Sequence, residues 1–350
     1  MLQPESIVSR LVSIRDSGDI DKSRHEASVL LEDLAMHPDD RINSYLRVDL
    51  EKIINSYSQE RASHYASRAI KSIIEVKTGR INDIDMNRWR EYDDIITDSL
   101  WIIGKRDRSG AHNADYWGNF IPQIPSQMIR RFTRKNEWVL DTFMGSGTTL
   151  IECRRNGRNG IGIELSQKVL DLAINNVNSE GNPYGVVTEG IRGDSTQIGY
   201  DGIMNQFGIK KFQLALIHPP YWDIIRFSED KEDLSNSRSL DEFLMKMKSV
   251  GQKTFDVLED GRMAILVIGD KYENGELIPL GFMTMSRMLE CGFRLKSIIV
   301  KNYDVTRGKT AMENLWRYRA LLGNFYVFKH EYIFVLEKRG RRSYKKAGKE

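Results

Sequence analysis

The segment Val139-Leu-Asp-Thr-Phe-Met-Gly-Ser-Gly-Thr-Thr149 decides the fold prediction for this chain. Its apolar start predicts a buried strand, and its glycines predict a turn from that strand into a helix. Glycine permits such a turn and lets a ligand approach the backbone closely. A helix that begins near Thr148 would direct its free N–H groups back toward the loop. The segment therefore predicts a ligand-binding loop at the end of a strand.

The chain that follows this loop alternates between strand-like and helix-like segments. Strands are expected at 138–142, 160–164, 185–193, 212–217, 262–268, 294–301 and 330–337, and helices at 148–156, 166–179, 240–258 and 279–290. This alternation predicts a mostly parallel sheet with helices on both faces, and the continuous apolar runs are typical of strands buried on both sides. We therefore expect a doubly wound α/β fold.

The N-terminal part of the chain has a different pattern. Over residues 1–100, apolar residues recur at helical spacing and predict three or four amphipathic helices. Breaks between them are expected at Met36–Asp40 and Thr78–Arg80. From 101 to 136 the sequence is polar and irregular, and it closes with a short basic helix over 127–134. We therefore expect an N-terminal helical domain ahead of the sheet.

Composition sets broad bounds on the protein. A chain of 350 residues can bury a full core and still carry a helical appendage. The apolar and charged fractions, 40% and 29%, are ordinary for a soluble protein. The net charge of +3 is only mildly basic, but an enzyme that acts on nucleic acid needs no more than a local positive face. Composition therefore permits a nucleic-acid substrate without pointing to one.

The two cysteines and the chain start bear on location. Cys153 and Cys291 lie in apolar helical contexts without metal-ligand spacing, so we expect buried, reduced thiols and no metal site. The first residues lack the basic and apolar regions of a secretory signal. No stretch approaches the eighteen uninterrupted apolar residues of a membrane helix. We therefore expect a cytoplasmic protein with no membrane partner.

A second decisive segment, Leu214-Ala-Leu-Ile-His-Pro-Pro-Tyr-Trp222, follows about seventy residues after the first. Its apolar part predicts another buried strand. The two prolines that follow fix φ and remove N–H donors, so they would make a rigid corner at the end of this strand.

Together, the glycine loop and the His-Pro-Pro-Tyr corner resemble the cofactor site and the catalytic site of the N4-cytosine and N6-adenine DNA methyltransferases. These enzymes belong largely to bacterial and phage restriction–modification systems. The match runs from about Asp115 to Leu336, with the loop before the corner, and 330–338 also resembles the family's closing strand. The resemblance implies a seven-stranded class I methyltransferase sheet within a domain over 101–338.

The resemblance also implies a reaction. S-adenosylmethionine would donate a methyl group directly to the exocyclic amino group of a base flipped out of double-stranded DNA. A cognate restriction endonuclease is a further implied partner. The chain would act as a monomer or a homodimer.

The spacing of the glycines favours S-adenosylmethionine over a dinucleotide. A dinucleotide site would need a third glycine, as in Gly-x-Gly-x-x-Gly, whereas this chain has Phe-x-Gly-x-Gly. The resemblance assigns cofactor binding to Phe120, Ile121, Pro122, Asp141, Phe143, Gly145, Ser146, Gly147, Thr148, Glu164 and Asp194. Glu164 would accept from the ribose hydroxyls and Asp194 from the adenine amino group, while the Phe120 segment would cover the methionine end.

Two of these assignments have plain alternatives. Glu164 could be only a favourable charge at the start of the next helix. The segment Phe120–Gln127 could be only a linker stiffened by its prolines.

The resemblance assigns catalysis to His218, Pro219, Pro220 and Tyr221. The target amino nitrogen is a poor nucleophile because its lone pair is delocalised into the ring. Acceptors for both amino hydrogens would favour a pyramidal nitrogen, and the His218 side chain and the Pro219 main-chain carbonyl would supply them. Tyr221 would stack on the flipped base, and Trp222 would either widen that platform or pack in the core. This chemistry requires no metal and no covalent intermediate.

Position 218 departs from the family, which usually has Asp, Asn or Ser there. A neutral imidazole has one acceptor nitrogen and an imidazolium has none. We therefore expect the chemical step to weaken as the pH falls through about 6.5, the ordinary pKa of histidine. The alternative is a packed histidine in an inactive enzyme. The target base stays open, although the Tyr221-Trp222 pair leans toward cytosine N4.

No segment stands out as a large target-recognition domain. The candidates are the loop 223–238, the N-terminal helices and the stretch 302–329. The alternative for this stretch is an ordinary insertion, over 301–329, between the last two strands. In that stretch basic residues alternate with aromatic ones, as suits phosphate contact and base stacking: Lys301, Arg307, Lys309, Arg317 and Arg319 with Tyr303, Trp316 and Tyr318. Arg307 and Lys309 are the proposed DNA contacts. The basic stretch Lys338 to Lys346, which leads into and overlaps the tail 339–350, is a solvated end or a further phosphate contact.

Two other functions fit the same motifs. Pro-Pro-Tyr corners also serve RNA amino groups, so an RNA base methyltransferase is one alternative. A catalytically silent DNA-binding or assembly subunit with the same fold is another. A glutamine methyltransferase would want Asn at position 218, so His218 counts against it.

Overall fold

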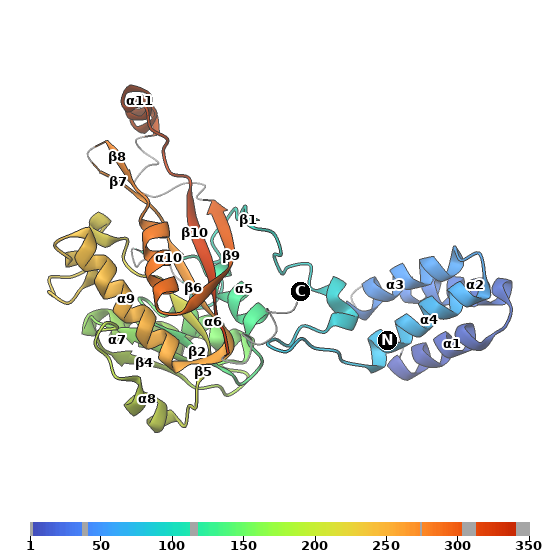
Figure 1. Ribbon diagram of the computed structural model, residues 1–350. Helices are drawn as coiled ribbons and strands as arrows, with labels where there is room; N and C mark the ends of the chain where they lie inside the picture. Colours follow the sequence, from blue (N-terminus) through green and yellow to red (C-terminus); the bar gives the residue numbers. More distant parts are fainter. Residues whose placement is uncertain (1–2, 37–40, 113–117, 274, 303–312, 341–350) are drawn as a thin grey trace, which may run out of the picture. The chain divides into compact units, whose positions relative to one another are not determined.

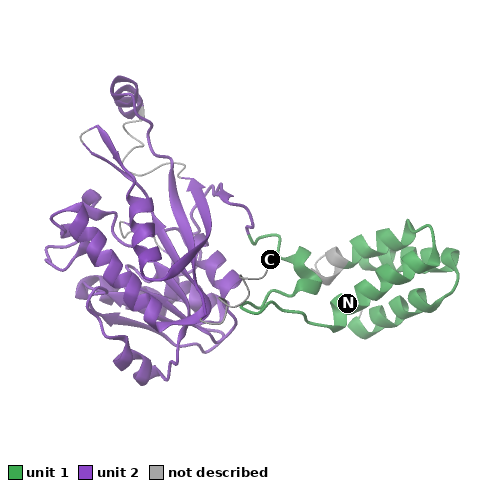
Figure 2. Cartoon of the chain, in the orientation of Figure 1, with its two compact units in different colours: residues 1–95 green, residues 96–350 purple. Residues whose placement is uncertain are grey.

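The computed structural model describes residues 3–36, 41–112, 118–273, 275–302 and 313–340. The chain divides into two compact units, Met1–Ile95 and Ile96–Glu350 (Figure 2). Within the described residues, every helix is too short or too polar to cross a lipid bilayer.

The first unit is a bundle of helices that pack side by side (Figure 1). Its elements are α1 (Pro4–Asp16), α2 (Ile20–Ala35), α3 (Arg41–Ile54), α4 (Gln59–Ile74) and the 3-10 helix η1 (Met86–Glu91). The side chains of Asp19 and Ser58 accept main-chain N–H groups at the starts of α2 and α4. The apolar residues that predict the helices form the core of the bundle, for example Leu11, Leu30 and Leu50. The expected break at Met36–Asp40 lies almost entirely outside the described residues.

The second unit is built on an eight-stranded sheet with the order β1-β9-β10-β6-β5-β2-β3-β4 (Figure 1). Its strands are β1 (Leu100–Trp101), β2 (Trp138–Asp141), β3 (Asn159–Glu164), β4 (Thr188–Arg192), β5 (Phe212–Ile217), β6 (Leu258–Ile268), β9 (Phe293–Asn302) and β10 (His330–Lys338). Strand β10 is antiparallel to both of its neighbours, and the other pairings in this sheet are parallel. A separate hairpin joins β7 (Lys271–Glu273) to β8 (Glu276–Ile278).

Two groups of helices flank this sheet. The helices of the unit are α5 (Gln123–Phe132), α6 (Thr148–Asn156), α7 (Gln167–Ser179), α8 (Tyr200–Phe207), α9 (Leu240–Val257), α10 (Leu280–Glu290) and α11 (Glu313–Gly323), with 3-10 turns η2 (Trp222–Ile224) and η3 (Leu234–Asn236). Helix α6 packs between α5 and α7, and α9 packs on α10. Residues of α8, α9 and α10 share one apolar core with the strands, and α6 and α7 share a second. The predicted doubly wound α/β fold is confirmed.

The sheet has one strand more than the seven predicted. Strand β1 is only two residues long and pairs with β9 at the sheet edge, so it is too short to produce an alternating pattern. The prediction also missed α8, α11 and the β7–β8 hairpin.

Two local predictions need correction. Helix α5 begins at Gln123, not 127, because Pro125 lies in the first turn, where a proline is tolerated since its N–H would have no helical partner. Lys338 does not belong to a solvated tail: its ammonium donates to the carbonyls of Phe255, at 2.6 Å, and Leu258, at 2.8 Å. Residues 341–350 of the tail lie outside the described residues. Cys153 and Cys291 are buried and free, as predicted.

Candidate functional site

A cleft with about 840 Å³ of empty space opens at the carboxyl ends of the central strands. Of the residues singled out from the sequence, those that line the cleft are Phe120, Phe143, Gly145, Glu164, Asp194, His218, Pro219 and Pro220. Those that lie outside its lining are Ile121, Pro122, Asp141, Ser146, Gly147, Thr148, Tyr221 and Trp222. The structure thus brings the acid at the end of β3, Glu164, and the histidine after β5, His218, to one cavity.

The glycine loop has the backbone shape that its sequence predicts. Gly145 and Gly147 have φ values of 52° and 90°, which favour glycine, and Gly147 leads directly into α6. A Cβ atom added at Gly147 would lie 2.9 Å from Cγ2 of Val177 and 3.3 Å from the carbonyl oxygen of Ala173. Gly147 is therefore needed both for the turn and for the close packing of the loop on α7.

Glu164 ties the end of β3 to the glycine loop. Its Oε2 accepts the N–H of Gly145 at 3.1 Å, and its Oε1 accepts the N–H of Ser166 at 2.9 Å. Burial raises the pKa of Glu164 to about 7, and the two N–H donors oppose this shift. Each carboxylate oxygen can still accept a further hydrogen bond from a ligand in the cleft.

Asp141 and Asp194 are held in a similar way, by their own neighbours in sequence. Asp141 is buried at the end of β2, and its Oδ1 accepts the N–H of Phe143 at 2.9 Å. Burial raises the pKa of Asp141 to about 6. Asp194 lines the cleft and accepts the N–H and the hydroxyl of Thr196, at 2.8 and 2.7 Å. Asp141 therefore supports the loop from behind, whereas Asp194 faces the cavity.

The outer wall of the cleft comes from two segments that are distant in sequence. Phe120 packs edge-on against the His218 ring, with 4.8 Å between the ring centroids. A Cβ atom added at Gly118 would lie 2.7 Å from the Phe227 ring, so these two residues are in close contact. Phe227 belongs to the loop 223–238, which the sequence offered as a DNA contact. Part of that loop lines the cleft.

Sequence reasoning missed several lining residues, among them Gly118, Asn119, Ser195, Phe227, Ser228 and Asp233. Asp233 holds its loop by accepting the N–H of Ser235 at 2.8 Å and the hydroxyl of Ser228 at 2.7 Å. Gly118 and Asn119 directly precede Phe120, so extending that motif would have found them. No motif marks Phe227 or Asp233.

His218 stands at the head of a chain of polar contacts. Its Nε2 lies 3.4 Å from the hydroxyl of Tyr221, which donates to Oε2 of Glu331 at 2.8 Å. The other oxygen of Glu331, Oε1, lies 2.9 Å from the ammonium of Lys301. Glu331 and Lys301 are each only 4% exposed and face each other across β10 and β9. The sequence analysis did not identify Glu331.

The surroundings of His218 correct the pH expectation. Burial lowers the pKa of His218 to about 4, with Lys301 adding to the shift and Glu331 opposing it. The imidazole is therefore neutral at pH 6.5 and keeps an acceptor nitrogen well below that value. The expected loss near 6.5 was wrong because it assumed the pKa of a solvated histidine.

Trp222 is held on several sides. It has a φ of 50°, which is unusual for a residue with a side chain, and its Nε1 donates to the carbonyl of Ser237 at 3.1 Å. The ammonium of Lys271 lies 4.1 Å from the Trp222 ring centroid, and its charge is balanced by Asp223, at 2.6 Å, and Glu273, at 2.9 Å.

A match to a known protein family shows which family the chain belongs to. The profile of a DNA methylase family, of the N6 and N4 type, matches residues 30–175 and 212–349. The chain belongs to this DNA methylase family. The resemblance that the two motifs suggested is confirmed.

Individual relatives cover shorter stretches. The chain is 45% identical to the Type II methyltransferase M.MjaII of Methanocaldococcus jannaschii over 69 residues, 19% of this chain and 13% of that protein. It is 40% identical to the Type II methyltransferase M.BglI of Bacillus subtilis over 96 residues, 27% of this chain and 26% of that protein. The matched part thus spans about a quarter or less of these curated relatives. Among solved structures, TrmN from Thermus thermophilus is similar, with 19% identity, a TM-score of 0.41, and coverage of 63% of this chain and 50% of that one.

The two units of the chain differ in net charge. Residues 1–95 contain 14 Lys and Arg against 18 Asp and Glu, a net charge of −4. Residues 96–350 contain 38 against 31, a net charge of +7. The net positive charge therefore lies in the second unit. Arg307 and Lys309 lie outside the described residues, and in α11 the Arg319 guanidinium lies 5.3 Å from the Trp316 ring centroid.

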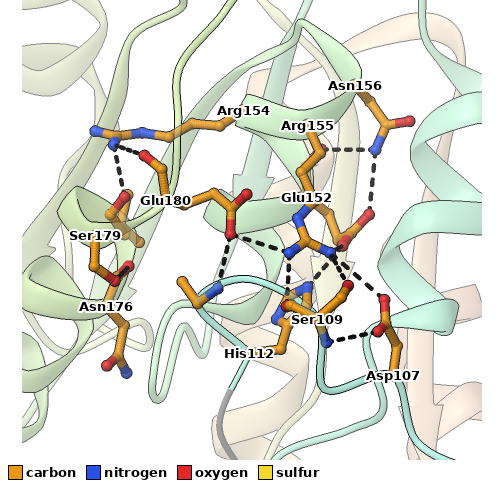
Figure 3. A network of polar contacts seen from close by, with 12 residues as sticks. Asp107, Ser109, His112, Glu152, Arg154, Arg155, Asn156, Asn176, Ser179 and Glu180 are labelled. Carbon is orange, nitrogen blue, oxygen red and sulfur yellow. Dashed lines mark hydrogen bonds and ion pairs between the residues drawn. The ribbon is translucent and has the colours of Figure 1, made fainter.

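A second polar cluster connects residues 107–112 to α6 (Figure 3). His112 and Glu152 are buried, with 2.7 Å between Nε2 and Oε1. The Arg155 guanidinium lies 3.5 Å from both Glu152 and Asp107, and 3.0 Å from Glu180. Asp107, His112 and Glu152 are grouped closely enough to bind a metal. Because Arg155 already places a cation among these acids, the cluster is better explained as an ion-pair network that fixes residues 107–112 to α6.

Proposed function

We propose that this protein transfers a methyl group from S-adenosylmethionine to the exocyclic amino group of a base in double-stranded DNA. The observation that carries the proposal is a shared cleft: Glu164 at the end of β3 and His218 after β5 line the same cavity. Acceptors for a cofactor's hydroxyls and for an amino group therefore open onto one space, as a direct transfer requires. Membership of the DNA methylase family supports the substrate class.

The donors and acceptors of the cleft fit S-adenosylmethionine. Glu164 keeps acceptor capacity on both oxygens, which suits two neighbouring ribose hydroxyls. Asp194 would accept from the adenine amino group, and Phe120 would cover the methionine end. When bound, S-adenosylmethionine supplies an electrophilic methyl group attached to a sulfonium.

The His-Pro-Pro corner would prepare the amino nitrogen. The neutral His218 ring and the Pro219 carbonyl would each accept one amino hydrogen, which leaves the nitrogen lone pair directed at the methyl group. The pKa of about 4 keeps His218 in its accepting form throughout the neutral range. The prolines hold this geometry because their rings fix φ.

The substrate base would reach this corner by leaving the duplex. Tyr221 would stack on the flipped base, and the Phe227 segment would limit water at the reacting atoms. The net charge of +7 over residues 96–350 supports DNA binding by this unit. Whether the base is cytosine or adenine, and whether a cognate restriction endonuclease exists, stay open predictions.

The test is a labelling experiment on the full chain. Purified protein and tritiated S-adenosylmethionine are incubated with mixed-sequence duplex DNA or with transfer RNA, and the product is digested to nucleosides. We expect label in N4-methylcytosine or N6-methyladenine from DNA. Label in RNA alone would move the assignment to an RNA methyltransferase.

An equilibrium binding measurement completes the test. A protein that binds S-adenosylmethionine and DNA but labels neither nucleic acid would be a silent subunit, and the proposal would be wrong. A H218F variant serves as the matched negative control for labelling, because phenylalanine keeps an aromatic ring beside Phe120 but has no acceptor nitrogen.

A further inference from the structure

We propose that Glu331 and Lys301 are positioning residues that act through Tyr221 to hold His218 as the tautomer with its proton on Nε2, so that Nδ1 accepts the amino hydrogen. The inference rests on the proposed function for the role of Nδ1, but the tautomer itself can be measured without any reaction. It concerns this chain in particular, because the choice of tautomer arises only with histidine at position 218.

The hydroxyl of Tyr221 has a single proton to donate. Its distance to the Glu331 carboxylate is 2.8 Å, and its distance to Nε2 of His218 is 3.4 Å. The shorter contact is also a charge-assisted one, so the proton belongs to the bond with Glu331. Toward His218 the Tyr221 oxygen can then only accept, and Nε2 must donate.

Ionised Glu331 stabilises the hydrogen bond that it accepts from the Tyr221 hydroxyl. Burial acts to raise the pKa of Glu331, but the Lys301 ammonium and the Tyr221 hydroxyl together hold it below its usual value. The pair with Lys301 is almost sealed from solvent and joins two neighbouring strands, so its position is fixed by the sheet. The Tyr221 ring is fixed as well, because a Cβ atom added at Gly269 would lie 3.0 Å from it.

The other ring nitrogen of His218, Nδ1, is the acceptor that we assign to the substrate. Nδ1 has no hydrogen-bond partner among the residues that the structure describes, and it is not among their enclosed polar atoms. His218 lines the cleft beside Pro219 and Pro220. With the proton on Nε2, Nδ1 carries a lone pair toward an incoming amino group. In the opposite tautomer, the Nδ1–H group of His218 would meet an N–H group of the substrate, and the two donors would repel each other.

The test is nitrogen NMR of the full chain labelled with ¹⁵N-histidine, combined with single-turnover methyl transfer. The chain has six histidines, and the His218 signals are assigned by their loss in H218F. We expect one tautomer, protonated at Nε2, in the unaltered protein. In Y221F the ring and the Glu331–Lys301 pair remain but the hydroxyl is gone, so we expect a mixture of tautomers and a transfer rate about tenfold lower.

Two further variants sharpen the test. In E331Q the side-chain amide can donate to the Tyr221 oxygen, which frees the hydroxyl proton to turn toward His218, so we expect the Nδ1-protonated form to increase. Tyr332 is the matched control, because its hydroxyl also bonds a carboxylate, Asp270 at 3.1 Å, but does not contact His218. Y332F should leave the tautomer and the rate within about twofold of the unaltered protein.

An Nδ1-protonated His218 in the unaltered protein, or a single unchanged tautomer in both Y221F and E331Q, would overturn the inference. A fixed Nε2-protonated ring that Y221F disturbs, in a protein that methylates no nucleic acid, would support the positioning network while the proposed function fails. The two failures are therefore distinguishable.

Discussion

The glycine loop and the His-Pro-Pro corner line one cleft but are held in different ways. At the loop, each acid accepts main-chain N–H groups: Glu164 those of Gly145 and Ser166, and Asp141 that of Phe143. These contacts depend on the course of the backbone and survive most side-chain changes nearby. The loop is thus supported by the same short segments that form it.

The corner depends on side chains from the far end of the chain. Tyr221 bonds Glu331, which lies 110 residues later, and Glu331 pairs with Lys301 on the neighbouring strand. Support of this kind can be altered by one substitution without moving the loop. The difference teaches that cofactor binding and methyl transfer should respond to different variants, although both use one cavity.

The largest expected effect is on the corner. H218F removes the acceptor at position 218 while keeping an aromatic ring, so we expect methyl transfer in single turnover to fall by about 10²–10³-fold. The affinity for S-adenosylmethionine should stay within about threefold, because the loop contacts do not pass through His218. Single-turnover kinetics and calorimetric binding on the same preparation check both. Joint loss of rate and affinity would mean that the two regions are not separable.

The next effect is on the loop. E164A removes the acceptor for the ribose hydroxyls, and we expect the affinity for S-adenosylmethionine to fall by about 10–100-fold, as for the loss of one or two charged hydrogen bonds. D171A, which removes an exposed acid from α7, is the matched control and should leave the affinity unchanged. An E164A protein that binds the cofactor normally would contradict the placement of the cofactor.

The pH dependence separates the two regions further. The pKa of Glu164, about 7, lies above its usual value, so below pH 7 the carboxyl is largely protonated and has one acceptor fewer. Bound hydroxyls favour the carboxylate, so cofactor affinity should rise about tenfold from pH 6 to pH 8 and level off above. The transfer rate at saturating cofactor should show no inflection from His218 in this range. A transfer rate that falls as the pH drops through 6.5 would indicate that His218 has an ordinary pKa.

The smallest expected effect is on stability. G147A introduces a side chain at a φ of 90° and close to Val177, so we expect a loss of about 1–3 kcal/mol in the free energy of unfolding. Gly202 in α8 has open space around it, and G202A should be neutral or stabilise by up to about 1 kcal/mol. Denaturant titration of the pair shows whether the loop needs glycine itself. Equal stability of the two variants would contradict this.

The same contrast explains what the sequence could predict. The loop, the strand ends and Glu164 follow from short-range patterns, because glycines, an apolar run and an acid at a strand end lie within one segment. The partners of His218 do not, because nothing in the local sequence of β9 and β10 shows that Lys301 and Glu331 face each other behind Tyr221. For the same reason the pKa of His218 was predicted wrongly.

Other failures have different physical origins. Strand β1 is too short to produce a periodic pattern and is defined only by its pairing with β9. Phe227 reaches the cleft because its loop folds back onto Gly118, more than a hundred residues earlier. The start of α5 was predicted four residues too late, because Pro125 lies in the first turn, a position that accommodates proline.

The most direct test compares the glycine loop and the His-Pro-Pro corner in one experiment, through cofactor binding and methyl transfer. Affinity for S-adenosylmethionine and the saturated single-turnover rate on duplex DNA are measured for the unaltered protein, E164A and H218F. We predict that E164A weakens binding but keeps a measurable rate at saturation, whereas H218F binds normally and transfers little. An unaltered protein that leaves DNA unmethylated, or an H218F protein with an unchanged rate, would contradict the central claim.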